Sequence, residues 1–134
     1  MNYVVGQELA AKTYKVNRAL LVNYANASGD QNPIHQDEAF AKSVGLPDVI
    51  AHGMFTMGLA GTYLSEIAGS AAVKEFGAKF VKPVVVPAGV DVELNISAKV
   101  TEVVEDLVRV ELTVICGEVK VLGSAKGAIK WQKN

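Results

Sequence analysis

In the second half of the chain, hydrophobic and polar residues alternate one by one, which is the period of a β-strand with one buried face. The alternation is clearest from Val90 to Val100 and continues through Leu107–Cys116 and Glu118–Trp131. Short polar or glycine-containing pairs at Glu105–Asp106 and Gly117–Glu118 interrupt it and are predicted as turns. The pattern therefore predicts an antiparallel arrangement of long strands.

The first half of the chain has a helical period instead. Asn17 is a predicted N-cap for a helix over Arg18–Ser28, and Gly29 follows at a position where a helix would end. A short second helix is predicted over Asp37–Val44 and a long third one over Met54–Ile67.

The third predicted helix determines the expected fold class. The stretch Val49–Gly69 has about the length of a membrane span, but it contains His52, Glu66 and several glycines. We interpret it as a helix that is hydrophobic nearly all round and buried inside a soluble protein. One face of the predicted sheet must be covered, and this helix is the segment apolar enough to cover it. The sequence therefore predicts an α+β fold in which an antiparallel sheet wraps around a long central helix. It does not fix the strand order.

Two further strands, one within Tyr3–Val16 and one within residues 74–84, complete the predicted sheet. The strands between Val90 and Trp131 contain little of the proline or bulge signal that protects a free sheet edge. A domain whose core is filled by a helix also has little room for a ligand tunnel, and ligand sites often lie between folded units. We therefore expect a dimer.

Composition and charge narrow the class of protein. The chain has 134 residues, of which 50% are hydrophobic and 20% charged, so a single packed domain over residues 1–134 is expected. Lys and Arg number 13 against 14 Asp and Glu, which argues against a dedicated nucleic-acid-binding protein. Cys116 is the only cysteine, which rules out an intrachain disulfide. The N-terminal residues lack the basic and apolar pattern of a signal peptide, so a cytoplasmic location without a membrane span is expected.

The stretch Ser28–Asp37, SGDQNPIHQD, is the part of the chain densest in groups that move protons. Such residues are common in loops for conformational reasons alone, and Asp37 is a candidate helix cap. However, Asp30 and His35 lie five positions apart in a loop that Pro33 stiffens, so their side chains can converge on one site. A carboxylate beside an imidazole provides a proton donor and a proton acceptor near neutral pH.

Asn32, His52 and Gly53 extend this candidate site. Asn32 can form hydrogen bonds that fix the loop or the carboxylate. His52 and Gly53 stand at the start of the third helix, where free backbone N–H groups stabilise negative charge as an oxyanion hole does. A packing interpretation of Gly53 also remains, and His52 is interpreted mainly as positioning the loop. Asp30, His35 and His52 match no metal-ligand spacing, so no metal and no other cofactor is predicted.

The segments SGDQNPIH and AHGMFTMG together resemble the MaoC-like (R)-specific enoyl hydratases and (3R)-hydroxyacyl-carrier-protein dehydratases. The resemblance extends over most of the chain and is strongest to the catalytic dehydratases of the mycobacterial type II fatty-acid synthase. It implies a hotdog fold and the reversible hydration of trans-2-enoyl thioesters of coenzyme A or acyl carrier protein. It also implies that Asp30 and His35 hold the catalytic water and that the Gly53 N–H faces the thioester oxygen.

Some alternatives remain open. Many members of the family have a compact turn where this chain has the longer Lys82–Leu94, KPVVVPAGVDVEL, so partner contacts there are not defined. A non-catalytic acyl-binding or partner subunit is the main alternative, and a thioesterase of the same fold is another. The presence of both Asp30 and His35 argues for an enzyme. The mycobacterial catalytic subunit pairs with a different chain, so the expected dimer contains either two identical chains or two related hotdog chains.

Overall fold

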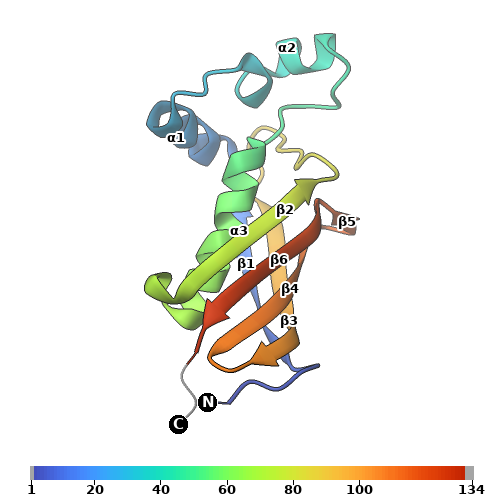
Figure 1. Cartoon of the computed structure of the whole chain (residues 1–134). Coiled ribbons are helices and arrows are strands. Elements are labelled where there is room, and N and C mark those ends of the chain that lie inside the picture. The colour runs from blue at the N-terminus through green and yellow to red at the C-terminus, as the bar shows by residue number, and fades with distance from the viewer. Residues whose placement is uncertain (1, 132–134) are drawn as a thin grey trace.

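The computed structural model describes residues 2–131, so the ends of the predicted 1–134 domain lie outside the described residues. Figure 1 shows one sheet, a long helix along one of its faces, and shorter helices beyond one end of the sheet. The helices are α1 (Arg18–Ser28), α2 (Glu38–Ser43) and α3 (Gly53–Ala68), with single 3-10 turns η1 (Pro33–His35) and η2 (Ser70–Ala72). The strands are β1 (Glu8–Val16), β2 (Val73–Phe80), β3 (Val92–Val104), β4 (Leu107–Cys116), β5 (Val119–Lys120) and β6 (Leu122–Lys130).

The ends of α1 and α2 follow local signals in the sequence. The Asn17 side chain accepts a hydrogen bond from the Leu20 N–H, and Gly29 ends α1 with φ of 83°. Glycine adopts this left-handed backbone without steric cost, which is why helices so often end on it. The Asp37 side chain caps α2 by accepting a hydrogen bond from the Phe40 N–H. Both predicted helices and both predicted caps are confirmed.

The strands form one antiparallel sheet in the order β1-β3-β4-β6-β2, with β5 paired to β4 off this path. The predicted strand Leu107–Cys116 is confirmed as β4, and the predicted turn at Glu105–Asp106 joins it to β3. The prediction of one strand over Glu118–Trp131 is wrong, because the segment divides into β5 and β6. Val121 and Leu122 are both buried, so the alternation on which that prediction depended breaks at this point.

The free edges of the sheet are β1 and β2. The prediction that the strands between Val90 and Trp131 leave the unprotected edge is therefore wrong, since β3, β4 and β6 are interior strands. Sequence alternation reports which face of a strand is buried, whereas its position in the sheet depends on non-local pairing. Both edge strands have register irregularities, one in β1 and two in β2, which is a common way to interrupt an edge.

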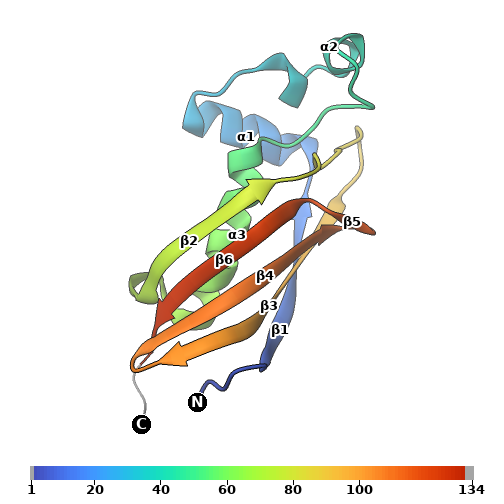
Figure 2. The same ribbon diagram turned by 45° about the vertical axis from the view of Figure 1, so that its right-hand side comes forward.

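Helix α3 lies across one face of the sheet (Figures 1 and 2). Alternate residues of β3 and β4 supply the sheet side of the core: Leu94, Ile96, Ala98, Val100, Val108, Val110, Leu112 and Val114. The helix supplies Ala60, Tyr63 and Leu64, all fully buried. The α+β prediction of a sheet packed around a long helix is confirmed.

The expectation that α3 is buried nearly all round is wrong for this chain. Met54 is 59% exposed, and Gly58, Thr62 and Glu66 along the same helix are exposed as well. A single sheet covers only one side of a helix, so the other side stays open. Within residues 2–131, none of the helices combines the length and hydropathy needed to span a bilayer.

Candidate active site

The stretch Ser28–Ile34 folds into three consecutive turns, each closed by a side-chain oxygen that accepts a backbone N–H two residues later. The Asp30 N–H donates to Ser28 Oγ at 3.2 Å, and the Asp30 carboxylate accepts from the Asn32 N–H at 3.1 Å. The Asn32 side chain in turn accepts from the Ile34 N–H at 3.2 Å and so caps η1. The Asn32 side chain therefore fixes the loop, and its backbone N–H bonds to the Asp30 carboxylate.

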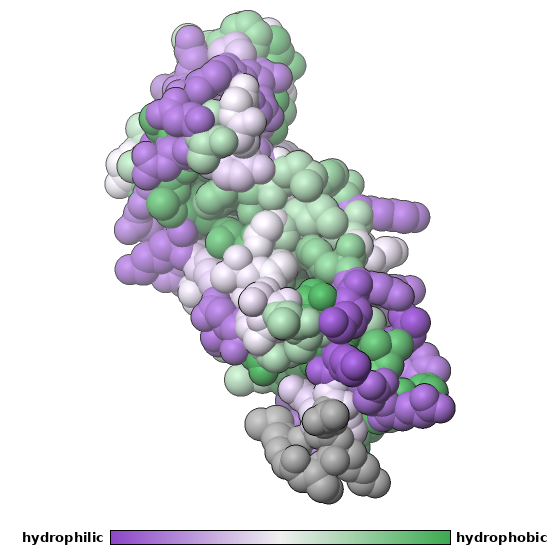
Figure 3. Space-filling view, turned by 60° about the vertical axis from the view of Figure 1, so that its left-hand side comes forward, coloured by the Kyte–Doolittle hydropathy of each residue, from purple (hydrophilic) through white to green (hydrophobic). Residues whose placement is uncertain are grey.

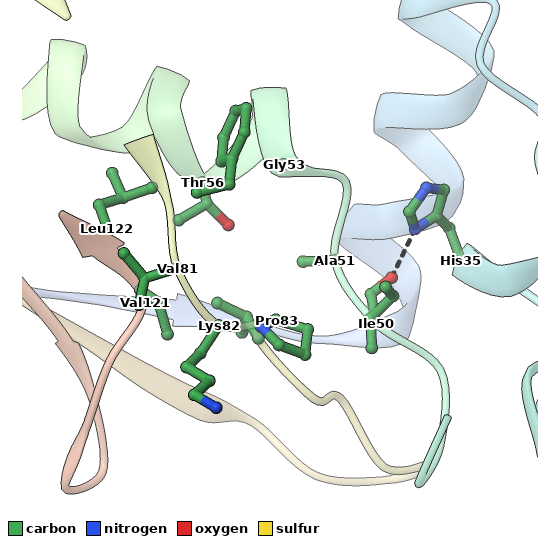
Figure 4. Close-up of a pocket in the computed structure, with 12 residues that line it drawn as sticks. His35, Ile50, Ala51, Gly53, Thr56, Val81, Lys82, Pro83, Val121 and Leu122 are labelled. Carbon is green, nitrogen blue, oxygen red and sulfur yellow. Dashed lines mark hydrogen bonds between the residues drawn. The ribbon is translucent and has the colours of Figure 1, made fainter. Parts of the chain in front are cut away.

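His35 is buried and held through its backbone-facing nitrogen. Nδ1 lies 2.7 Å from the Ile50 carbonyl oxygen, which can only accept, so Nδ1 carries the hydrogen (Figure 4). The neutral ring then keeps its lone pair on Nε2. Burial, aided by the nearby His52, lowers the pKa of His35, while the Ile50 carbonyl and Asp30 act in the opposite direction. The neutral imidazole is thus the form favoured at neutral pH.

His52 supports both members of the pair. Its ring stacks on that of His35 with centroids 3.8 Å apart and an angle of 25°. Its Nε2 lies 3.1 Å from the Asp30 carbonyl oxygen and donates to it, and the Tyr24 ring makes an edge contact with the His52 ring at a centroid distance of 4.7 Å. His52 Nδ1 is buried and has no hydrogen-bond partner among the described residues. These contacts agree with the predicted positioning role of His52.

Asp30, His35 and His52 converge as predicted, because each offers an atom within 4.8 Å of the others. No direct hydrogen bond joins the Asp30 carboxylate to His35 among residues 2–131. Two hydrogen bonds of about 2.8 Å each can span such a separation through one water. Asp30 is exposed and His35 is buried, so this shared position lies at the boundary between solvent and interior.

The same three residues are a candidate metal cluster by proximity. Imidazole nitrogens bind a metal through lone pairs that lie in the ring plane. Because the rings of His35 and His52 are stacked nearly parallel, these lone pairs do not point at one common ion. His52 Nε2 is also engaged with the Asp30 carbonyl. The geometry therefore favours a water-binding site over a metal site, and the absence of a metal stays a prediction.

A pocket of about 280 Å³ opens beside His35 (Figure 4). Its lining residues are His35, Ile50, Ala51, Gly53, Thr56, Phe80, Val81, Lys82, Pro83, Val84, Val121 and Leu122. Most of these are apolar, as an acyl chain would require. Lys82 is the one lining residue with a permanent charge, and Figure 4 shows its ammonium group pointing away from His35.

Gly53 is the first residue of α3 and lies in the pocket wall. Its N–H has no hydrogen-bond partner among the described residues, as is usual in the first turn of a helix. A Cβ placed on Gly53 would come within 3.1 Å of the Phe80 ring. The packing interpretation of Gly53 therefore involves the Phe80 side chain, and the oxyanion interpretation stays a prediction.

Sequence reasoning missed the Ile50 carbonyl and the second half of the pocket wall, which Phe80, Val121 and Leu122 supply. A backbone acceptor has no residue signature. The wall forms where the end of β2 meets the start of β6, two segments far apart in the chain. Near this wall, Pro83 is the residue whose type marks an interruption of the predicted strand 74–84, since proline is disfavoured inside a sheet.

An antiparallel sheet packed around a long helix is the architecture of the hotdog class of folds, and this chain has it. Within this class, a family model described as "MaoC like domain" matches residues 2–119, and the chain belongs to this family. The resemblance noted in the sequence is thereby confirmed.

Individual relatives agree. 3-Hydroxyacyl-thioester dehydratase X of Mycobacterium tuberculosis is 40% identical over 79 residues, which are 58% of this chain and 27% of that protein. A solved MaoC-like dehydratase superposes with a TM-score of 0.94 at 35% identity, covering 98% of this chain and 41% of the other. R-hydratase PhaJ1 from Pseudomonas aeruginosa, at 24% identity, shares the fold with a TM-score of 0.83 over 98% of this chain and 84% of its own. The chain thus spans about a quarter of the curated relative.

Proposed function

We propose that this chain catalyses the reversible hydration of trans-2-enoyl thioesters of coenzyme A or acyl carrier protein. The reverse reaction is the dehydration of (3R)-hydroxyacyl thioesters. The observation that carries the proposal is the convergence of Asp30 and His35 within 4.8 Å beside an apolar pocket whose wall includes the start of α3. Membership of the MaoC-like family and the name of the mycobacterial dehydratase support it.

In the hydration direction, a water lies between the Asp30 carboxylate and His35 Nε2. The pair takes one proton as the water oxygen bonds to C3, and the electrons of the C2–C3 double bond shift toward the thioester oxygen. The Gly53 N–H and the N-terminus of α3 stabilise this developing negative charge. The pair then returns the proton to C2, so every atom of the water is added. Asp30 and His35 act here as one coupled acid–base unit.

The first prediction tests the reaction itself. Crotonyl-CoA and a longer enoyl-CoA should lose the absorbance of their conjugated double bond without releasing free thiol, and chiral chromatography should show the 3R product. A thioesterase would release thiol, and a non-catalytic subunit alone would do neither. A 3S product would overturn the assignment to this type of hydratase.

We further propose that residues 1–134 form one domain that works as a dimer. Figure 3 shows a band of apolar surface across the middle of one side of the molecule. Two large apolar residues are exposed: Met54 of α3 at 59%, and Phe80 of the pocket lining at 57%. The uncovered side of α3 and the free edge of β2 offer further surface to a second chain.

The second prediction concerns this assembly. Light scattering of the purified chain should report a dimer, or a monomer that becomes dimeric and active when a related hotdog chain lacking the Asp–His pair is added. An identical pair would hold two sites and a mixed pair one, so titration with a tight-binding substrate analogue distinguishes them. A monomer with full hydratase activity at the assay concentration would contradict the proposal.

A further inference from the structure

We infer that Arg18 is a positioning residue for His35, because it holds in place the backbone segment whose Ile50 carbonyl orients the imidazole ring. The inference rests on the proposed function only in that His35 serves the hydration reaction. The effect of Arg18 on His35 can be tested without measuring enzyme activity.

Arg18 contacts three segments that are distant from it in sequence. Its Nε donates to the Val86 carbonyl oxygen at 2.6 Å, and its Nη2 donates to Asp48 Oδ1 at 2.8 Å. Glu38 lies 3.5 Å from the same Nη2. The guanidinium of α1 therefore joins the start of α2, the segment before α3 and the segment after β2 at one point. A planar fork of donors suits such a junction better than an ammonium group does.

Two of these segments, residues 48–51 and 84–86, also pair with each other. The Val86 N–H donates to the Val49 carbonyl at 2.8 Å, and the Ala51 N–H donates to the Val84 carbonyl at 2.9 Å. Ile50 lies between these bonded positions, opposite Val85. They form a two-segment ladder over residues 48–51 and 84–86, and Arg18 binds it at the end farthest from α3.

The ladder decides where the Ile50 carbonyl points. In an antiparallel pair, successive residues direct their backbone groups to opposite sides. Val49 and Ala51 face residues 84–86, so Ile50 faces away, toward the catalytic loop. There its N–H donates to the Ile34 carbonyl at 3.2 Å and its carbonyl accepts from His35 Nδ1 at 2.7 Å. A shift of the ladder would therefore shift or rotate the imidazole.

Two observations separate Arg18 from an ordinary surface ion pair. The Arg18 and Asp48 side chains are only 23% and 15% exposed, whereas both partners of the Arg109–Glu75 pair are 44% or more exposed. Asp48 is also fixed by accepting from the Val49 N–H at 2.7 Å, and this bond and Arg18 lower the pKa of its carboxyl.

The position of Arg18 in α1 supports the same role. A cation in the first turn of a helix faces the positive end of the helix dipole, which is locally unfavourable. Arg18 is the first residue of α1, directly after the Asn17 cap. Its tertiary contacts must therefore offset this local cost, which is consistent with a role in holding the ladder.

The third prediction tests this role by measuring the pKa of His35 in Arg18→Met. The protein has only two histidines, so NMR titration resolves both rings, and loss of one signal in His35→Gln assigns them. In the wild type His35 should titrate below the ordinary value of about 6.5, because burial is the largest influence on it. In Arg18→Met the loosened ladder admits water and also weakens the bond to the Ile50 carbonyl; because burial is the larger of these two opposing influences, the pKa should rise toward that value.

Hydration should change together with the pKa. We expect kcat/KM of Arg18→Met to fall by about 10- to 100-fold, the scale of a small misplacement of a reacting group. The acid limb of its pH profile should move to higher pH along with the His35 pKa. Arg18→Lys keeps a charge opposite Asp48 without the planar fork. Its kcat/KM and its His35 pKa should lie between those of the wild type and those of Arg18→Met.

Arg109→Met is the matched control, because it removes an arginine and its ion pairs with Glu75 and Glu102 outside the pocket. It should leave the His35 pKa and kcat/KM unchanged. A folded Arg18→Met with a wild-type His35 pKa and wild-type pH profile overturns the inference. Where that variant does not fold, Arg18→Lys and Asp48→Asn decide, and wild-type values in both overturn it. A shifted pKa in a chain without hydratase activity instead refutes the proposed function alone.

Discussion

Replacing Asp30 with Asn, or His35 with Gln, is expected to lower the hydration rate by about 10²–10⁴-fold, the usual contribution of a general acid–base group. In Asp30→Asn the new side chain keeps an oxygen that can accept from the Asn32 N–H, so the loop should persist while the charge is lost. In His35→Gln the new amide can still donate to the Ile50 carbonyl but offers no basic nitrogen to a water. Initial rates on crotonyl-CoA, together with melting curves, measure the effect.

Asp37→Asn provides the matched control for Asp30→Asn. It makes the same chemical change in the same stretch, and asparagine replaces aspartate well as the cap of α2. Its hydration rate should remain at the wild-type level. Turnover near the wild-type level in Asp30→Asn or His35→Gln, with an unchanged melting curve, would show that the residue concerned has no acid–base role.

Gly53→Pro is expected to lower the hydration rate by about 10²–10³-fold, which is the cost of losing one oxyanion donor. Proline removes the backbone N–H but is well tolerated as the first residue of a helix. The preceding His52 has φ of −57° and ψ of 134°, a conformation that a residue before proline prefers. Helix α3 should therefore still begin at the same residue, and the loss should appear in kcat.

Gly53→Ala separates the N–H from the packing interpretation. Alanine keeps the donor and places its Cβ against the Phe80 ring, whose exposed side chain can move aside. It should therefore retain most of the activity. Equal losses in the alanine and proline variants would show that Gly53 is required for its small size and that its N–H does not stabilise the substrate oxygen.

The parts of the site that sequence predicts are those encoded locally. Pro33 and the turn residues around it bring Asp30 and His35 together within a few positions of one another. The partner that sets the His35 tautomer is a carbonyl of Ile50, and any residue at that position would provide one. Only the pairing of residues 48–51 with 84–86 places it there, and such pairing leaves no periodic signal.

In the fold, too, the sequence predicted the features encoded locally and missed those set by pairing between distant segments. Alternation in β3 and β4 predicted which residues are buried, because that pattern belongs to each strand alone. The apolar character of α3 did not reveal that Met54 stays exposed, because the sheet covers only one side of the helix and the sequence of the helix does not show which side. The edges β1 and β2 could not be identified because each pairs with a strand that comes much later in the chain.

That strand order also limits how the chain can fold during synthesis. Strand β1 pairs with β3, Val16 lying opposite Val92, and β2 pairs with β6, Phe80 lying opposite Leu122. Neither of the first two strands meets its neighbour until the ribosome has made most of the chain. The β3–β4 hairpin is the most local of the long pairings, since its strands are joined by a short turn. Until β6 emerges, the apolar side of α3 has no complete sheet to pack on, so the first half of the nascent chain stays exposed to aggregation and to chaperones.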